Sequence, residues 1–423
     1  MKKFKVILIG AGGRGTCYTN EMAKMPEQFE VVAVAEPLAS RRDFIQKKHN
    51  LSDAQCFTDW KPLLEKGKIA DIAVIGTMDR DHLEPSMAAI GLGYDLLLEK
   101  PIAPTPSECK QITDYANEKN VKVVICTVLR YTPIFSRIKE ILDSGRLGEI
   151  MSINHEECVG NEHQSHSFVR GNWGNAEKSS SMLLQKSCHD MDILQWLIGK
   201  KCKKVQSFGA RSYFTEKNAP EGAPEYCIEG CPHKDTCYYN AVKLYLERTN
   251  EETWFRSHAA QEAAPSDERI KEIISTTQYG KCVFKCDNTV VDHQTVNMLF
   301  EDDITVTFSM NAFNKGGRFI HIMGTKGELN AALDSESPIR FFDFGTRETE
   351  EIPIFGADGI GGGHAGGDSG IIKTLYDYLS KTYTGNSVPE INESYMNHLI
   401  TFAAEESRKT GQVIDMDAYA ASI

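Results

Sequence analysis

The first 127 residues alternate between short apolar runs and segments with helical spacing. The apolar runs are rich in branched residues, as in strands buried on both faces of a sheet, and predict strands at residues 4–9, 30–35, 71–75, 95–99 and 121–127. One intervening helix is expected to begin at Pro106, with Thr105 as its N-cap and Glu108 three residues after the cap. This alternation predicts a parallel, doubly wound sheet.

Beyond residue 127 the pattern changes to longer strands that alternate apolar and polar positions, as at 305–313 and 318–324. Such strands are typical of a sheet with one covered and one open face. Residues 200–290 are rich in polar residues, cysteine and tyrosine and are expected to form an insertion. We therefore predict an α/β protein with an N-terminal NAD(P)-binding Rossmann domain over residues 1–127. A C-terminal α+β domain over residues 128–423 would carry a large, mostly open sheet, bind the substrate and form a homo-oligomer.

Composition excludes some classes of function. The net charge of −12 and the absence of a basic stripe argue against nucleic acid as a partner. The apolar run near the N-terminus is too short for a secretory signal, and no segment approaches the roughly 18 apolar residues needed to cross a membrane. We expect a cytoplasmic protein with no membrane partner, in which cysteines are thiols or metal ligands.

A glycine motif follows the first strand directly. Gly10, Gly12 and Gly15 have the spacing G-x-G-x-x-G, which permits a tight turn, close approach of a pyrophosphate and close packing of helix on strand. Glu36 ends the second strand about twenty residues later, where a carboxylate can bind both ribose hydroxyls and repel a 2′-phosphate. NAD is therefore expected as cofactor, while two arginines after Glu36 keep NADP possible.

Two further segments carry candidate chemistry. Glu99 and Lys100 follow a buried strand, and ligands of doubly wound sheets bind beyond the carboxyl ends of strands. In residues 183–199, Gln185, His189 and Asp192 lie four and three positions apart, on the helix face opposite an apolar stripe. A histidine between an amide and a carboxylate suits proton transfer near neutral pH. The alternative for both segments is an ordinary solvated surface.

A polar loop and a glycine-rich turn complete the candidate pocket. The loop carries hydrogen-bonding groups and a stacking face suited to sugar hydroxyls, contributed by His163, His166, Arg170 and Trp173. An ordinary surface loop is equally compatible with these residues. In the turn, His364 and Asp368 could also line the pocket, although the aspartate could simply cap a helix.

The cysteines of the insertion are clustered. Cys227, Cys231 and Cys237 lie within eleven residues, and Cys282 and Cys286 follow later. Three clustered thiols and one distant thiol, with Cys286 as the favoured fourth, could hold a structural zinc ion. An iron–sulfur cluster would also use four thiolates. The remaining alternative is that these cysteines are free thiols in a loop-rich insertion.

The glycine loop, Glu36, the tripeptide Glu99-Lys100-Pro101 and the later HDMD segment together resemble the Gfo/Idh/MocA oxidoreductase family over nearly the whole chain. The resemblance implies an NAD(P)-dependent enzyme that transfers a hydride between nicotinamide and a secondary alcohol of a sugar, sugar acid or cyclitol. It implies catalytic roles for two residues. Lys100 would bridge nicotinamide and the substrate hydroxyl, and His189 would exchange a proton at the carbinol oxygen.

The resemblance also implies binding residues. Those expected at the cofactor are Gly10, Gly12, Gly13, Arg14, Gly15, Glu36, Thr77, His82, Glu99, Lys100 and Pro101. Gln185, Lys186 and Asp192 are expected at the substrate. The family usually has an aspartate at the position of Gln185, and because an amide cannot take up a proton, more of the chemistry shifts to Lys100. A redox-assisted glycosidase that recycles its NADH and a non-catalytic NAD-binding sensor are the alternative functions.

Overall fold

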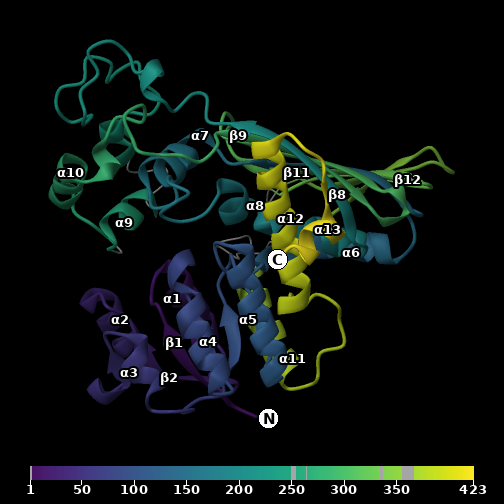
Figure 1. Cartoon of the computed structure of the whole chain (residues 1–423), viewed down its shortest axis with the longest axis horizontal. Helices are drawn as coiled ribbons and strands as arrows, with labels where there is room; N and C mark the ends of the chain where they lie inside the picture. The colour runs from purple at the N-terminus through teal and green to yellow at the C-terminus, as the bar shows by residue number, and fades with distance from the viewer. Residues whose placement is uncertain (1, 249–253, 263, 334–336, 355–365) are drawn as a thin grey trace.

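The computed structural model describes residues 2–248, 254–262, 264–333, 337–354 and 366–423, and these residues form two sheets (Figure 1). The first sheet has six parallel strands in the order β3-β2-β1-β4-β5-β6. Its strands are β1 (Phe4–Ile9), β2 (Phe29–Ala35), β3 (Cys56–Phe57), β4 (Ile72–Ile75), β5 (Asp95–Leu98) and β6 (Val123–Ile125). The order reverses between β1 and β4, and ligands of such sheets bind at this switch point.

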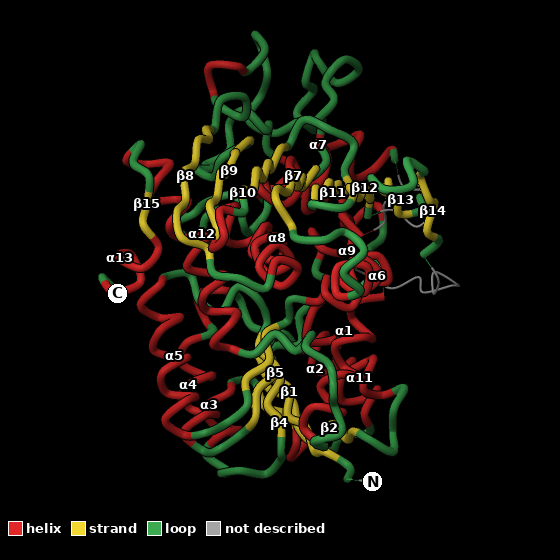
Figure 2. Tube along the Cα trace, turned by 90° about the vertical axis from the view of Figure 1, so that its right-hand side faces the viewer, coloured by secondary structure: helices red, strands yellow, loops and turns green. Residues whose placement is uncertain are grey.

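Helices cover both faces of this sheet, as Figure 2 shows. One face packs against α1 (Gly13–Ala23), α2 (Ala39–His49) and α11 (Gly367–Leu379), and the other against α3 (Trp60–Leu64), α4 (Leu83–Gly91) and α5 (Pro106–Lys119). Val6 and Leu8 of β1 enter one layer while Ile7 and Ile9 enter the other, which explains the uninterrupted apolar run. The predicted Rossmann fold is confirmed.

The second sheet has nine strands in the order β14-β13-β12-β11-β7-β10-β9-β8-β15. Its strands are β7 (Ile150–Cys158), β8 (Cys202–Ala210), β9 (His293–Phe300), β10 (Thr305–Asn311), β11 (Gly317–Gly324), β12 (Gly327–Ala332), β13 (Ile339–Asp343), β14 (Thr349–Ile352) and β15 (Ile414–Asp415). The helices α6 (Pro133–Asp143), α8 (Met182–Ile198), α12 (Ile391–Thr410) and α13 (Met416–Ala421) supply the core beneath it.

The opposite face of this sheet is open, since Phe208 and Phe319 are 57% and 43% exposed. The predicted α+β architecture with a mostly open sheet is thereby confirmed, and pairing through that face stays a prediction.

The insertion lies between β8 and β9 and has its own core, which includes Tyr245, Phe255, Ile270 and Ile274. Its main helices are the π-helix η6 (Lys243–Glu247), α9 (Trp254–Ala260) and α10 (Asp267–Thr276). Before α8, the short α7 (Asn161–His163) continues into the π-helix η4 (Gln164–Arg170). Single 3₁₀ turns are η1 (Asp53–Gln55), η2 (Asp79–Asp81), η3 (Val128–Tyr131), η5 (Glu216–Asn218), η7 (Gln278–Gly280) and η8 (Glu301–Asp303). Among the described helices, none is long and apolar enough to span a lipid bilayer.

A buried ion pair holds α8 in place. Arg130 of η3 donates two hydrogen bonds to Asp192 of α8, at 2.7 and 2.6 Å, and both side chains are 0% exposed. Arg130 also pairs with Glu393 of α12 at 2.9 Å, and Asn397 donates to Asp192 at 2.7 Å. Because an isolated buried charge is costly, these groups stabilise the fold only as a set. Asp192 therefore orients its helix.

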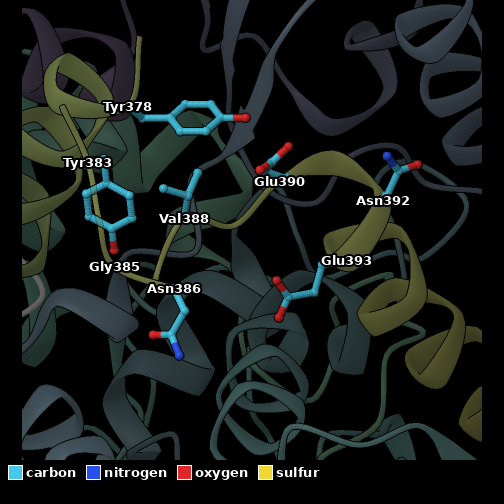
Figure 3. A pocket seen from close by; sticks show the side chains of 8 residues that line it. All are labelled: Tyr378, Tyr383, Gly385, Asn386, Val388, Glu390, Asn392 and Glu393. Atoms are coloured by element: carbon cyan, nitrogen blue, oxygen red, sulfur yellow. The ribbon is translucent and has the colours of Figure 1, made fainter. Parts of the chain in front are cut away.

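Glu393 also borders a pocket of about 350 Å³. Figure 3 shows Tyr378 of α11, together with Glu390 and Glu393, around it. The residues lining this pocket are Tyr378, Tyr383, Gly385, Asn386, Val388, Glu390, Asn392 and Glu393. None of them is a predicted site residue, but Glu393 reaches the predicted residue Asp192 through Arg130.

Replacing Arg130 by Ala should lower the free energy of unfolding by about 3–5 kcal/mol, because Asp192 would remain as an unpaired buried charge. Urea unfolding followed by circular dichroism measures the loss. Arg137→Ala is the matched control, since Arg137 forms an exposed pair with Glu140 and its loss should cost at most about 1 kcal/mol. Equal losses in the two variants would contradict a structural role for the buried pair.

Candidate functional site

The glycine loop is crowded on one side and open on the other. A Cβ at Gly10 would lie 2.7 Å from the carbonyl carbon of Gly76, and one at Gly15 would lie 2.1 Å from the Gly10 oxygen. Gly10 also has a φ of +87°, which favours glycine. By contrast, no atom of the described residues lies within 4 Å of a Cβ at Gly13. The open side is the N-terminus of α1, so the loop fits a dinucleotide pyrophosphate.

Glu36 lies at the rim of this loop, directly after β2. One oxygen of its buried carboxylate accepts the Ala11 N–H at 2.7 Å, and the other accepts the Leu38 N–H at 3.0 Å. The Arg42 guanidinium donates to the Glu36 main-chain oxygen at 2.7 Å. The carboxylate is therefore anchored beside the glycine loop, in the position predicted for the residue that binds the ribose of the cofactor.

Glu99 is buried directly after β5. One carboxylate oxygen accepts hydrogen bonds from Arg14 Nε at 2.9 Å and from the Tyr18 hydroxyl at 2.5 Å, and the other accepts the Lys100 N–H at 2.8 Å. Burial alone would raise the pKa of Glu99, but the charges of Arg14 and Lys100 and the hydrogen bonds hold that pKa below its usual value. Glu99 therefore remains an anion that fixes the backbone at Lys100.

Arg14 connects the glycine loop to the end of the chain. Its guanidinium pairs with the Asp368 carboxylate, in the first turn of α11, at 2.6 and 3.1 Å. Asp368 thus stabilises the cofactor side of the site. His364, its predicted neighbour in the pocket, lies outside the described residues.

His82 joins the loops that follow β4 and β5. Its Nδ1 lies 2.8 Å from the Pro101 oxygen and its Nε2 lies 3.2 Å from the Thr77 oxygen, and the ring is buried. The Lys100–Pro101 peptide bond is cis. The predicted cofactor residues Thr77, His82 and Pro101 are therefore brought together at the carboxyl edge of the first sheet.

Lys100 extends from that edge to α8. Its Nζ donates a hydrogen bond to the main-chain oxygen of Gln185 at 2.8 Å. Ser181 caps α8 by accepting the Leu184 N–H at 3.2 Å, which fixes the start of the helix. His189 lies one turn beyond Gln185 and is also buried. The structure thus brings the predicted lysine to the first turns of the predicted histidine helix.

Lys186 belongs to a buried charge network that the sequence did not predict. Its Nζ pairs with Glu157 at 3.3 Å, and Arg318 bonds both Glu157 at 2.6 Å and Asp190 at 2.8 Å. His155 Nε2 lies 2.8 Å from Asp190. Burial lowers the pKa of Lys186, and neighbouring cations lower it further against the opposing effect of Glu157. Charged residues at inward positions of β7 were the signal that could have revealed this network.

His163 lies on α7, six residues after Glu157, whose carboxylate pairs with Lys186. Burial, and then the charges of Lys186, His166, Arg318 and Lys100, hold the pKa of His163 well below its usual value. Its ring contacts the indole of Trp254 with centroids 5.2 Å apart. The site therefore combines two ammonium groups with a neutral imidazole.

The other residues of this loop turn toward the insertion. His166 Nδ1 lies 2.7 Å from the Tyr245 hydroxyl, and Arg170 donates to two main-chain oxygens of the insertion at 2.8 and 2.6 Å. Trp173 stacks on His258 with centroids 5.5 Å apart. Since His166 and Arg170 are fully buried with these partners, the structure does not bring them to Lys100.

The cysteines do not support the zinc expectation. In the part of the chain that the structure describes, no group of three or more histidines, cysteines or acidic residues could hold a metal ion. The Arg170 guanidinium lies 3.9 Å from the sulfur of Cys227, and burial raises the pKa of Cys286 to about 11. The cation beside the Cys227 sulfur and the raised pKa values of the Cys237 and Cys286 thiols oppose the binding of a metal at this cluster.

His398 of α12 supports the loop after Lys100. Its Nε2 accepts the Ile102 N–H at 3.0 Å, so the proton is on Nδ1, which donates to the Ser394 oxygen at 2.7 Å. Burial is the main cause that lowers the pKa of His398 to about 4. A protonated ring could not accept the Ile102 bond.

Replacing Glu36 by Ser should lower the ratio of the NADPH to the NADH dissociation constant about tenfold, because the carboxylate that repels the 2′-phosphate is removed. Both affinities should fall somewhat, since the Ala11 and Leu38 N–H groups lose their acceptor. Fluorescence titration with each dinucleotide measures the ratio. Glu30→Ser, exposed on the same strand, is the control. An unchanged ratio in Glu36→Ser would contradict the ribose assignment.

Acidification should destabilise the protein through His398. Because the folded-state pKa is depressed, the unfolded chain binds this proton more readily, and the stabilisation present above pH 6.5 is lost as the pH falls toward about 4. His398→Gln keeps an acceptor for Ile102 without this titration, so its thermal midpoint should fall less steeply over that pH range. Parallel slopes for the variant and the original protein would contradict the role of His398.

Comparisons with known proteins agree with this geometry. Residues 4–127 match the model of an oxidoreductase family with an NAD-binding Rossmann fold, and residues 139–416 match the C-terminal alpha/beta domain of the same family. YteT of Bacillus subtilis, an oxidoreductase by name, is 23% identical over 325 residues, which are 72% of each chain. An inositol 2-dehydrogenase of Salmonella typhimurium is 25% identical over 209 residues, which are 49% of this chain and 58% of that protein.

Among solved structures, an oxidoreductase from Agrobacterium radiobacter in complex with NAD⁺, L-tartaric acid and magnesium has the same fold. Its TM-score is 0.70 at 15% identity, with 99% of both chains covered. The two family matches together extend over most of the chain. The first match includes Lys100, and the second includes α8, to which Lys100 bonds. The chain therefore belongs to the Gfo/Idh/MocA family of NAD-binding oxidoreductases.

Proposed function

We propose that this protein is an NAD-dependent dehydrogenase that oxidises a secondary alcohol of a sugar, sugar acid or cyclitol. The observation that carries the proposal is the 2.8 Å bond from Lys100 Nζ to the Gln185 oxygen. It places an ammonium group between the carboxyl edge of the dinucleotide-binding sheet and the helix that carries His189. Similarity to an inositol 2-dehydrogenase supports a ring polyol as the substrate class.

The glycine loop, Glu36 and the loops joined by His82 would hold the cofactor. When bound, the nicotinamide accepts a hydride from the carbinol carbon. The anionic Glu99 fixes Lys100, and the cationic Nζ of Lys100 stabilises the negative charge that develops on the carbinol oxygen. Fixed positioning of this charge is the contribution of the protein.

His189 is proposed to accept the hydroxyl proton. An imidazole is suited to this step near neutral pH, whereas the amide of Gln185 can only donate or accept a hydrogen bond. Lys186 lies next to Gln185 and has a carboxylate partner, so its proposed role is to bind a substrate hydroxyl. Gln185 also favours a second candidate, a non-catalytic NAD-binding sensor, which would bind the cofactor and turn over no alcohol.

Lys100→Ala and His189→Ala should each lower turnover by about 10²- to 10⁴-fold, as expected for loss of proton transfer or charge stabilisation. NADH formation is measured against inositols, monosaccharides, sugar acids and aryl glycosides, and NADH binding is measured by fluorescence. Both variants should still bind NADH, and Lys110→Ala, which removes an exposed lysine of α5, should behave like the original protein.

Undiminished hydride transfer in Lys100→Ala would contradict the proposal. Cleavage of aryl glycosides without accumulation of NADH would instead indicate a redox-assisted glycosidase. Tight NADH binding without turnover of any compound would indicate the sensor.

A further inference from the structure

The insertion contributes an aromatic side chain to the vicinity of the two lysines. Trp254 is the first residue of α9 and is 40% exposed. Its indole meets the rings of His163 and His166 nearly at right angles, with centroids 5.2 and 5.1 Å apart. These edge-to-face contacts fix the orientation of the indole while leaving much of its surface accessible.

His163 connects this indole to the candidate chemistry. His163 lies on α7, six residues after Glu157 of β7, and the Glu157 carboxylate pairs with Lys186 at 3.3 Å. Lys186 in turn follows Gln185, whose main-chain oxygen accepts the bond from Lys100, and the charges of both lysines contribute to the lowered pKa of His163. Trp254 therefore contacts the short helix that follows the strand carrying the partner of Lys186. No other exposed tryptophan in the described part of the chain contacts a residue of the candidate site.

α9 is held firmly in this position. His258 lies one turn after Trp254, and its Nδ1 is 3.0 Å from His166 Nε2. The other nitrogen of His166 bonds the Tyr245 hydroxyl at 2.7 Å, and Trp173 stacks on His258 at an interplanar angle of 19°. A buried chain of hydrogen bonds and stacked rings thus fixes the helix that carries the indole.

The same helix extends toward the cofactor loop. After burial, the charge of Arg41 also lowers the pKa of His258, and the Arg41 guanidinium lies 3.8 Å from the position of a Cβ at Gly12. Figures 1 and 2 both place α9 on the side of the insertion that faces α1 and α2. Residues 254 and 258 share one helix face, so the indole and His258 lie together on the helix of the insertion that is nearest to the cofactor domain.

We propose that Trp254 is a substrate-binding residue whose indole stacks on the C–H face of a pyranose or cyclitol ring held at Lys100. A saturated ring presents a flat apolar face between its hydroxyls, which matches an indole whose edge is fixed by imidazoles. An open-chain polyol or hydroxy acid has no such face. The insertion would thus select ring-shaped alcohols, and this inference rests on the proposed function.

The test compares Trp254→Ala, Trp254→Phe and the control Trp60→Ala, whose indole lies on α3 against Lys61. For the ring alcohol that the original protein oxidises best, Trp254→Ala should raise KM at least tenfold with kcat and the NADH dissociation constant changed less than threefold. Trp254→Phe should recover most of the affinity, and Trp60→Ala should change nothing. KM for an acyclic polyol should be unaffected by either Trp254 variant, an outcome that general misfolding would not give.

Calorimetric titration of ring and acyclic alcohols into NADH-loaded protein separates this inference from the proposed dehydrogenase. If the ring binds without being oxidised and Trp254→Ala weakens that binding, the dehydrogenase proposal fails and the ring subsite stands. If oxidation occurs but KM in Trp254→Ala is unchanged, the subsite is overturned and the dehydrogenase stands. Failure of the original protein to bind any ring alcohol overturns the subsite as well.

Discussion

The buried carboxylate of Glu99 is the constraint on which the rest of the candidate site depends. An anion at the end of a buried strand is tolerated only if each oxygen is satisfied. Arg14 and Tyr18 satisfy one oxygen, and the Lys100 N–H satisfies the other. This arrangement fixes the main chain at Lys100 and also joins the glycine loop to β5. Because Arg14 additionally binds Asp368, the start of α11 becomes part of the same unit.

The two halves of the molecule are joined by buried polar contacts close to that unit. Lys100 bonds the start of α8, and His398 of α12 accepts the Ile102 N–H. Each contact is directional, so it specifies a relative position that apolar packing alone would leave less defined. The lysine and His189 are therefore placed by the same contacts that hold the second sheet against the first.

Much of the fold was predictable because its signals are local. Continuous apolar runs, the G-x-G-x-x-G spacing and the cap at Thr105 each depend on a few neighbouring residues. Lys100 and Gln185 were predicted individually, but their contact was not, because it joins residues 85 positions apart in the chain. The charge network was not predictable, since Glu157 and Arg318 face each other through the register of β7 and β11, strands far apart in the chain. The burial of His166 and Arg170 was not predictable either, because their partners lie in the insertion, far away in the chain.

Lys100 and His189 are proposed to converge on one hydroxyl beside the nicotinamide. A crystal structure of the protein with NADH and a ring polyol tests it most directly. We expect one ligand oxygen within hydrogen-bonding distance of both Lys100 Nζ and His189, with the carbon that bears it facing the nicotinamide. A polyol bound away from Lys100, or a nicotinamide placed on the far side of the sheet from α8, would contradict it.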